Sequence, residues 1–452
     1  MNKNLALFIF FLLLLLGLRF FFFYHNQPQY HDGDKLDFHT TLLSEPQIVG
    51  NRQQLSANLS TGNKIFITIP QYPQFHYGDT VRISGPIRVL PRAGGFQPRA
   101  REGQPYGAST QKDKALDNKN LILAMYFPKI EAGSPRGEAG KSDNLISNNI
   151  INSVLATVSF IRQKVIYLFE KSLPPTSASL LLGIVFGIKE AMPKDFSQNL
   201  RVAGVLHVIA ASGMNVTLIG SFLSSVFAFF FKRQIALVAS IVGIVFYALL
   251  AGLEASIIRA SIMGVLVFSA QILGRQSLAL YGLSIAGFLM LFISPYLLHD
   301  VGFQLSFAST LGLLYIKPLI EKEKIKAVLE KSIIGEGLTT TIAAQIATLP
   351  ILLANFGSYS LISILVNGLV LWTVPALMVI GGLGAIIGIV VAPLGQLILY
   401  LSLPLLIYFE KVVNFFAYFI NPVSVASLPW QFILGYYTLI GSFLILFKKK
   451  NR

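Results

Sequence analysis

The hydrophobic and polar positions divide the chain into three regions. An apolar run over residues 4–24 follows Lys3. Residues 27–149 are polar and contain short stretches of alternating apolar and polar residues, whereas the chain beyond about residue 176 is almost continuously apolar. A helix of about 20 apolar residues can cross a bilayer. The pattern therefore predicts a polytopic α-helical membrane protein with a small β domain near its N-terminus.

The first apolar run predicts a transmembrane anchor over residues 1–26. A cation precedes the run and no small-residue cleavage site follows it, which favours a retained helix with its N-terminus inside. Arg19 lies near the far end, where its side chain can extend to the interface. The β domain would then be extracytoplasmic.

The β domain is predicted over residues 27–149 from five strand candidates. These read KLDFHTTLL, RQQLSANLS, KIFITIP, DTVRISGPI and LILAMYFPKI. Five short strands in a domain of this size predict a small β-barrel of the OB-fold type. A basic loop over residues 86–120 precedes the last candidate and supplies four arginines that are candidate contacts for a polyanion such as a nucleic acid, Arg88, Arg92, Arg99 and Arg101.

Charge alone does not establish nucleic-acid binding by this domain. It carries 14 Lys and Arg against 11 Asp and Glu, a balance of only +3. Exposed loops are often basic without a specific ligand. The domain can therefore be a module that binds a nucleic-acid strand or a structural gate.

Residues 150–175 predict an amphipathic helix. Val158, Val165 and Phe169 fall on one face, and we place Arg162 and Lys164 mainly opposite them. A helix lying in the membrane interface fits this pattern, and so does a helix packed against the β domain.

Residues 176–447 form the predicted channel domain, followed by a basic cytoplasmic tail at 448–452. The cations Lys232, Arg233 and Arg275 and the KEKIK loop at 322–326 all fall on the cytoplasmic side if the short run near Ile184 is not a full span. The same count places the tail outside, so one run after Ser358 is expected to be re-entrant or broken.

Polar side chains interrupt the apolar runs in five places, of which GVLHVIAASGMNV is the first. Each one alone is explained by a hydrogen bond that only fastens the helix bundle. Five clusters together favour a polar path through it. The candidates for this path are His207, Ser212, Gly213, Asn215, Glu254, Arg259, Asp300, Gln304, Ser306, Gln345 and Asn367. We expect Arg259 to pair with Glu254, although it can also attract phosphate.

Composition agrees with this class and narrows the chemistry. The 452 residues are 54% hydrophobic and 13% charged, which excludes an ordinary soluble domain. The net charge of +15 is explained by cytoplasmic loops, with polyanion binding as the other explanation. The absence of cysteine excludes disulfides, thiolate metal sites and cysteine nucleophiles.

An intramembrane serine hydrolase is the enzymatic alternative, because His207 and Ser212 lie close in sequence. On one helix, residues five apart diverge by about 140°, so the pair cannot meet unless the helix breaks. We therefore expect no catalytic residue, and no metal site or cofactor either, since no ligand spacing or P-loop motif is present.

Several stretches resemble the ComEC-type competence proteins, the membrane channels for incoming single-stranded DNA in natural transformation. GVLHVIAASGMNV is similar to their signature: Gly204, His207, Ser212 and Gly213 match, while Asn215 replaces a second histidine. DVGFQLSFASTLG and QIATLPILLANFGSYSLISILVN resemble two further blocks, and the Arg259-Ala260 pair resembles a fourth. The resemblance covers about three quarters of the chain.

The resemblance implies a DNA-uptake channel in the bacterial cytoplasmic (inner) membrane. The implied partners are single-stranded DNA, membrane lipid, a separate nuclease, a cytoplasmic ATPase or helicase motor, a DNA receptor and, as a homo-oligomer, further copies of the chain. Longer members carry a metallo-β-lactamase-like domain, whose His/Asp metal motif is not found here. The alternative is a transporter or flippase of a lipid-linked or polyanionic envelope molecule, built on the same scaffold.

Overall fold

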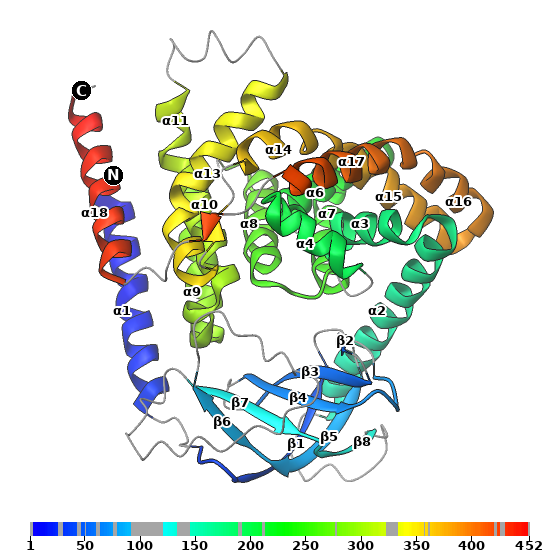
Figure 1. The fold of residues 1–452 in the computed structure, drawn as a ribbon. Coiled ribbons are helices and arrows are strands. Elements are labelled where there is room, and N and C mark those ends of the chain that lie inside the picture. The colour runs from blue at the N-terminus through cyan, green and yellow to red at the C-terminus, as the bar shows by residue number, and fades with distance from the viewer. Residues whose placement is uncertain are drawn as a thin grey trace. The chain divides into compact units, whose positions relative to one another are not determined.

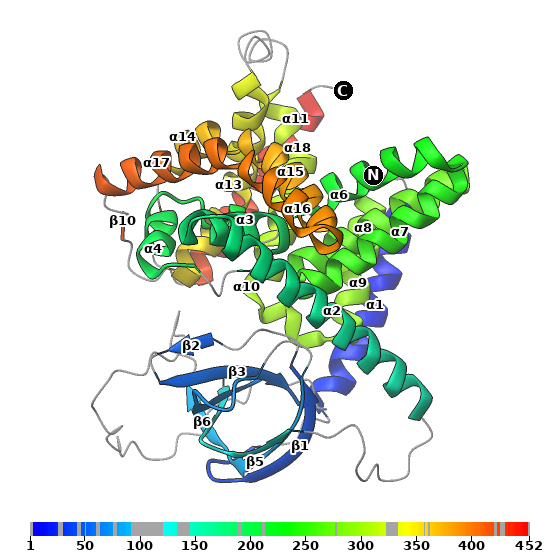
Figure 2. The same cartoon turned by 90° about the vertical axis from the view of Figure 1, so that its right-hand side faces the viewer.

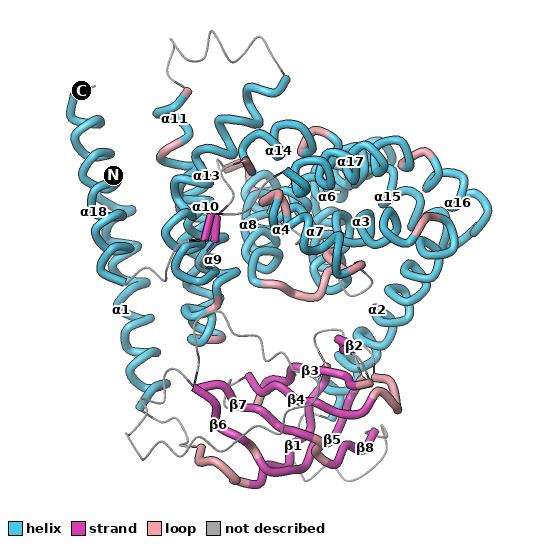
Figure 3. The backbone as a smooth tube through the Cα atoms, in the orientation of Figure 1, coloured by secondary structure: helices cyan, strands magenta, loops and turns pink. Residues whose placement is uncertain are grey.

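A computed structural model describes most of the chain in two compact units (Figures 1 and 3). The described residues are 3–25, 30–42, 47–49, 51–59, 64–75, 79–91, 121–132, 145–188, 192–209, 213–275, 278–321, 333–356, 358–359, 362–419, 423–424 and 430–450. One unit comprises Met1–Phe20 and Phe160–Arg452 and is mainly helical, and the other comprises Phe21–Ser159 and holds the β domain. We call them the helical unit and the β unit.

The β unit contains eight described strands in two sheets. They are β1 (Lys35–Thr41), β2 (Gln47–Val49), β3 (Arg52–Asn58), β4 (Lys64–Pro70), β5 (Thr80–Pro86), β6 (Arg88–Pro91), β7 (Leu121–Tyr126) and β8 (Lys129–Ala132). The sheets have the orders β1-β5-β8 and β2-β3-β4-β7-β6. Only Ile87 separates β5 from β6, and only two residues separate β7 from β8, so two long strands pass from one sheet to the other (Figure 2).

The strand pairing matches a five-stranded Greek-key barrel of the OB type. Five strands result if β5–β6 and β7–β8 each count as one strand and the three-residue β2 is set aside. β4 then pairs in parallel with β7, while the other pairings are antiparallel. The side chains that alternate inward, such as Leu55, Ile67 and Ile83, form one buried core. The predicted β domain is therefore confirmed.

The fifth predicted strand, LILAMYFPKI, is present as β7 and β8, with a bend at Phe127. This residue has a positive φ of 52°, which is rare for a bulky side chain, and Pro128 after it has no N–H to donate. Gly85 of β5 leaves room for the bend, since a Cβ there would lie 2.9 Å from the Pro128 Cβ. The sequence prediction also omitted β2 and β6.

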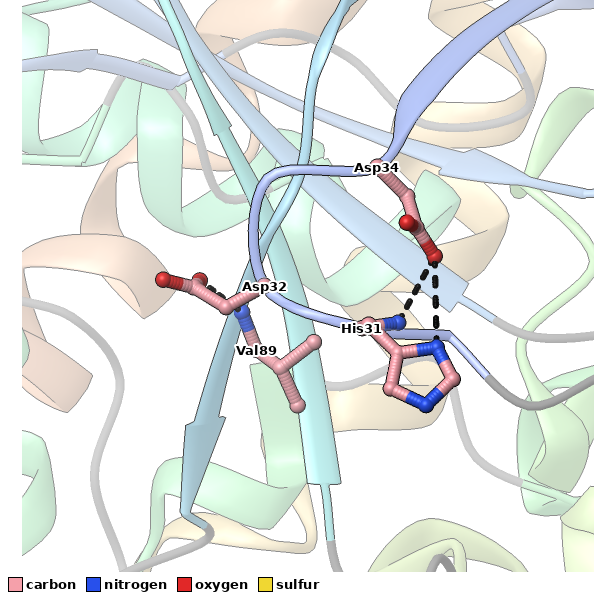
Figure 4. A network of polar contacts seen from close by, with 4 residues as sticks. All are labelled: His31, Asp32, Asp34 and Val89. Carbon is pink, nitrogen blue, oxygen red and sulfur yellow. Dashed lines mark hydrogen bonds and ion pairs between the residues drawn. The ribbon is translucent and has the colours of Figure 1, made fainter.

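A tight turn before β1 fastens the two sheets (Figure 4). The Asp32 carboxylate accepts a hydrogen bond from the Val89 N–H in β6 at 3.0 Å, and Asp34 accepts one from the His31 N–H at 2.7 Å. Gly33 adopts the positive φ that the turn requires, and its N–H donates to the Ile87 carbonyl.

The helical unit holds the remaining elements, apart from the parts of α1 and α2 that extend into the β unit. They are α1 (Lys3–His25), α2 (Leu145–Ser172), α3 (Pro175–Phe186), α4 (Lys194–Val202), α5 (Leu206–Ile209), α6 (Gly213–Phe230), α7 (Arg233–Leu250), α8 (Ala255–Ile272), α9 (Ala279–Ile293), the 3-10 helix η2 (Pro295–His299), α10 (Val301–Tyr315), α11 (Lys317–Ile320), α13 (Ile333–Phe356), β9 (Ser358–Tyr359), α14 (Ser363–Val370), α15 (Thr373–Val390), α16 (Ala392–Tyr400), α17 (Leu403–Phe419), β10 (Val423–Ser424) and α18 (Trp430–Lys450).

Five helical stretches in the described part are long and apolar enough to cross a membrane. They are α6, α7, α8, the α10–α11 stretch Val301–Ile320 and α15, and the pair α16–α17, bent by 46°, would make a sixth. The chain is thus a multi-pass membrane protein. With 12 residues, α3 is too short to be a full span, as the predicted topology requires.

The later part of the chain leaves one end of the bundle and returns to the same end. β9 follows α13, β10 precedes α18, and the two pair antiparallel. The chain between Tyr359 and Val423 therefore cannot make an odd number of crossings. The bent α16–α17 pair is a broken span or a re-entrant segment by its geometry, which is the kind of segment predicted after Ser358.

The C-terminal half of α2 packs into the core of the helical unit. Val165, Leu168 and Phe169 are buried among residues of α3, α15 and α17. Arg162 is only 6% exposed, so its predicted position on the polar face is wrong. It lies four residues after Val158 and three before Val165, which places all three on the same helical face.

Candidate functional site

Three membrane helices meet around Arg259, where α8 and α10 contribute polar groups and α6 contributes Gly213. α6 and α7 are joined by two residues, and α7 and α8 by four, so α6 and α8 begin at the same end of the bundle. Arg259 lies in the second turn of α8 and contacts Ser306 in the second turn of α10. The starts of α6, α8 and α10 therefore converge, and we call this cluster the Arg259 site.

The Arg259 guanidinium is held by neutral partners. Its Nε donates to the Ser306 hydroxyl at 2.7 Å, and its Nη1 donates to the Thr310 hydroxyl at 2.6 Å. The Met263 sulfur lies 3.7 Å from Nη1, and the Phe307 ring centroid lies 6.0 Å from the guanidinium carbon. With 8% of its surface exposed, Arg259 is a largely buried cation.

Gly213, the first residue of α6, forms the remaining wall of the Arg259 site. A Cβ at this position would lie 2.8 Å from Arg259 Nη2, which is too close for an undisturbed side chain. Glycine therefore allows the guanidinium to approach the first turn of α6. Among the described residues, Nη2 has no hydrogen-bond acceptor.

The expected pairing of Arg259 with Glu254 is wrong for the described structure. Arg259 donates to hydroxyls of α10, while Glu254 occupies the N-cap position of α8. Side chains of a helix point toward its N-terminus, but residues five apart lie on different faces. No ion pair joins Arg259 to a carboxylate within the described ranges.

Other cations of the helical unit bind the C-terminal ends of helices. Arg162 of α2 donates to the carbonyl of Leu250, the last residue of α7, at 3.4 Å. Lys164 donates to the Ile389 carbonyl near the end of α15 at 2.9 Å, and Arg19 donates to the Phe292 carbonyl near the end of α9 at 3.2 Å. These positions are favourable because a helix ends with unpaired carbonyls and a partial negative charge.

Asn215 holds the end of α3 rather than lining a path. Its amide donates to the Ile184 carbonyl at 2.8 Å, and the Tyr247 hydroxyl of α7 donates to the neighbouring Val185 carbonyl at 2.9 Å. Asn215 is 1% exposed. Since α3 ends inside the bundle, these two donors satisfy carbonyls that water would otherwise bind.

The other described candidates do not join the Arg259 site. Gln345 of α13 donates to the Ser363 hydroxyl of α14 at 2.8 Å, and Asn367 is buried in α14. Asp300 caps α10 by accepting from the Phe303 N–H, and Gln304 donates to the Leu298 carbonyl. His207 is exposed on α5. The Gln345 contact fastens two helices, whereas the Asp300 and Gln304 bonds are local to the start of α10.

Several candidates lie outside the described residues. Ser212 is one, so the proximity of its hydroxyl to His207 is not addressed by the structure. Arg92, Arg99 and Arg101 are also outside, while Arg88 is an exposed residue that begins β6. In the described part of the chain, no three His, Cys, Asp or Glu side chains come close enough to hold a metal ion.

Sequence reasoning missed three residues of these contacts, namely Thr310, Tyr247 and Arg162. Thr310 could have been found, because it lies four residues after Ser306 on the same helical face. Tyr247 gave no signal within an apolar run. Arg162 required the helical positions of α2 to be assigned correctly.

Residues 184–450 match a family of known proteins described as competence protein. This match covers more than half of the chain and includes every residue of the Arg259 site. The chain belongs to the competence protein family. It is also similar to ComE operon protein 3 of Bacillus subtilis (strain 168), with 24% identity over 211 residues.

That similarity covers 46% of this chain and 26% of ComE operon protein 3, so the chain matches about a quarter of the relative's length. No solved structure matches the chain at a significant level. Family membership agrees with the resemblance of the sequence blocks, whereas the roles of individual residues come from the contacts described above.

Proposed function

We propose that this competence-family protein is a channel for the uptake of single-stranded DNA across the bacterial cytoplasmic membrane during natural transformation. The observation that carries the proposal is the Arg259 site, in which a buried arginine of α8 is held by hydroxyls of α10 against the start of α6, within the family region. A bundle that needed only to be fastened would not require a buried cation there.

The chemistry of the substrate explains why such a site is needed. A DNA strand carries one negative charge per nucleotide, and the free-energy cost of moving charged groups from water into hydrocarbon is prohibitive. The Ser306 and Thr310 hydroxyls hold one cation in place. A strand that meets one fixed cation, and not a row of lysines, is held less tightly and can move on.

The distribution of cations supports an orientation of the helical unit in the membrane. Lys232 and Arg233 lie at the end of the bundle where α6 finishes, and Arg275 lies where α8 finishes. Positive loops favour the cytoplasm. The beginnings of α6, α8 and α10, and with them the Arg259 site, then face the extracytoplasmic side, from which DNA enters.

The β unit supports the proposal with an aromatic surface. Tyr72 and Phe127 are 72% and 53% exposed, and the Arg52 guanidinium lies 5.3 Å from the Phe127 ring centroid. Exposed aromatic rings beside cations are typical of surfaces on which single-stranded bases stack. Phe127 presents its ring from a backbone conformation with positive φ, as residues at binding sites often do.

Uptake also requires activities for which we assign no residues here. We propose that a separate nuclease removes one strand, a DNA receptor delivers the substrate, and a cytoplasmic ATPase or helicase pulls the strand. We also propose that membrane lipid surrounds the helical unit and that further copies of the chain join it in a homo-oligomer.

The test is the internalisation of fluorescent DNA by naturally competent cells that lack their own channel and express this chain. We expect the wild type to restore uptake and Ser306→Leu, at equal membrane abundance, to abolish it. Leu311→Ala is the matched control on α10, because Leu311 is 41% exposed and outside the site. Absence of uptake by abundant wild-type protein, with the family nuclease and motor present, would refute the proposal and favour an envelope-molecule transporter.

A further inference from the structure

We propose that Arg259 is a phosphate-binding residue that receives the backbone of the DNA strand at the extracytoplasmic mouth of the helical unit. This inference rests on the proposed function and deepens it. It assigns one side chain, one functional group of the substrate and one end of the bundle.

Arg259 has no carboxylate partner in the part of the chain that the structure describes. Only 8% of the Arg259 surface is exposed, and its side-chain nitrogens donate to the hydroxyls of Ser306 and Thr310. Taking a guanidinium out of water is costly unless a negative charge is close. An anion bound at this position would supply that charge.

The Arg259 guanidinium lies among the N-terminal ends of three helices. It lies against Gly213 at the start of α6 and within the first two turns of α8 and α10. Helix beginnings carry unpaired N–H groups and a partial positive charge. They oppose a cation and favour an anion, so the guanidinium and the three helix beginnings have the same preference for phosphate.

The Arg259 Nη2 is a donor that the described residues leave available. Nε and Nη1 are used by Ser306 and Thr310, whereas Nη2 has no acceptor among the described residues and faces Gly213. The two hydroxyl contacts fix the plane of the guanidinium. Nη2 can therefore donate to a phosphate oxygen without first losing another partner.

A lysine would not serve equally well at this position. The planar guanidinium donates to Ser306 and Thr310 and still presents a donor on its other edge. An ammonium group is a compact charge that cannot span both hydroxyls and a ligand in the same geometry. The charge and the shape of the side chain can thus be tested separately.

The experiment measures binding of a fluorescent 20-nucleotide oligo(dT) to the purified full-length chain in a maltoside detergent, which contains no phosphate. We expect Arg259→Gln to weaken binding about tenfold. We also expect it to reduce the slope of log affinity against log salt by about 0.7, the value for one phosphate contact on a single strand. Arg259→Lys should keep the slope but lose part of the affinity.

Arg275→Gln is the matched control, since it removes one positive charge from an exposed position after α8. Its affinity and slope should equal those of the wild type. A methylphosphonate oligo(dT), which lacks backbone charge, should bind wild type and Arg259→Gln alike. If Arg259→Gln does not fold, Arg259→Lys and Gly213→Ala carry the test, because both are expected to weaken binding.

Wild-type affinity and slope in folded Arg259 variants would overturn the inference, and so would a wild type that does not bind oligo(dT). Competition of oligo(dT) with inorganic phosphate and with phosphatidylglycerol shows which source of phosphate Arg259 binds. Binding that depends on Arg259 for the lipid but not for oligo(dT) would also overturn it. The uptake assay reports on the proposed function independently: uptake by both wild type and Arg259→Gln would refute the inference and leave the channel standing.

Discussion

Arg162 and Arg259 are both buried in the helical unit, but they occupy opposite electrostatic positions. Arg162 binds the carbonyl at the end of α7, where the helix carries a partial negative charge. Arg259 lies among the beginnings of α6, α8 and α10, where the partial charge is positive, and its partners are hydroxyls.

The difference separates a structural cation from a functional one. Arg162 has a position that a helix end stabilises in the protein alone. Arg259 has a position that only an added anion would make favourable, and such locally costly arrangements are expected at functional sites. Burial and residue type alone would have given both arginines the same role.

The largest expected effect separates function from stability at Arg259. Arg259→Gln should reduce DNA uptake at least about tenfold. It should change the free energy of unfolding by no more than about 1 kcal/mol, because glutamine still bonds to hydroxyls and removes an unfavourable charge. Uptake per cell and thermal unfolding in detergent check the two parts. A parallel fall in both would mean that Arg259 is structural.

Arg162→Gln should give the reverse result. Loss of the charged donor to the Leu250 carbonyl should lower the free energy of unfolding by about 1–3 kcal/mol. Uptake, normalised to the amount of folded protein in the membrane, should stay near the wild-type value. Normalised uptake as low as that of Arg259→Gln would remove the distinction between the two arginines.

The contact between Asn215 and α3 gives a third, structural comparison. Asn215→Ala should destabilise the protein by about 1–3 kcal/mol, because the Ile184 carbonyl would remain buried without its side-chain donor. Asn215→His, the residue expected from the family resemblance, should recover part of the loss by restoring a donor. The measurement is the melting temperature of the three proteins. A wild-type melting temperature for Asn215→Ala would contradict the assignment.

The smallest expected effect on stability concerns the solvent-exposed ion pair between Arg82 and Asp37 in the β unit. The hydrogen bonds of the Arg82 guanidinium hold the pKa of the exposed Asp37 below its usual value of 3.8. The pair therefore stabilises the β unit above the pKa of unfolded aspartate, and this contribution is lost as pH falls through the lower folded pKa.

Asp37→Asn should then differ slightly from wild type near pH 6, and the difference should disappear toward about pH 3. Unfolding followed by circular dichroism across this range checks it. A difference that grows as the pH falls would show that the sign is wrong. Because both side chains are exposed, this pair provides the solvent-screened contrast to Arg259.

The sequence pattern was sufficient for the class of fold and most strands. Alternation located β1, β3, β4 and β5, and run lengths located the helices, because both depend on local periodicity. The break at Phe127 was not predictable in this way, since it depends on Gly85 in another strand. The even number of membrane crossings between β9 and β10 was not predictable either, because it follows from the pairing of these two strands, which are far apart in the sequence.

The candidate site was only partly predictable. The candidates taken from interrupted apolar runs include Gly213, Arg259 and Ser306, which meet in the structure. The pattern drew attention to the polar ones because lipid offers such groups no partners. Which of them meet depends on helix packing that periodicity does not contain. Asn215 and Gln345 gave the same sequence signal as Arg259, yet they contact Ile184 and Ser363 instead.

The most direct test of the account is DNA uptake per molecule of membrane protein by Arg259→Lys and Arg162→Lys in cells that lack their own channel. Both variants conserve charge, so they compare the two sites alone. The account predicts that Arg259→Lys loses at least about fivefold in uptake because the planar guanidinium is needed, while Arg162→Lys stays near wild type. Equal uptake by the two variants would contradict it.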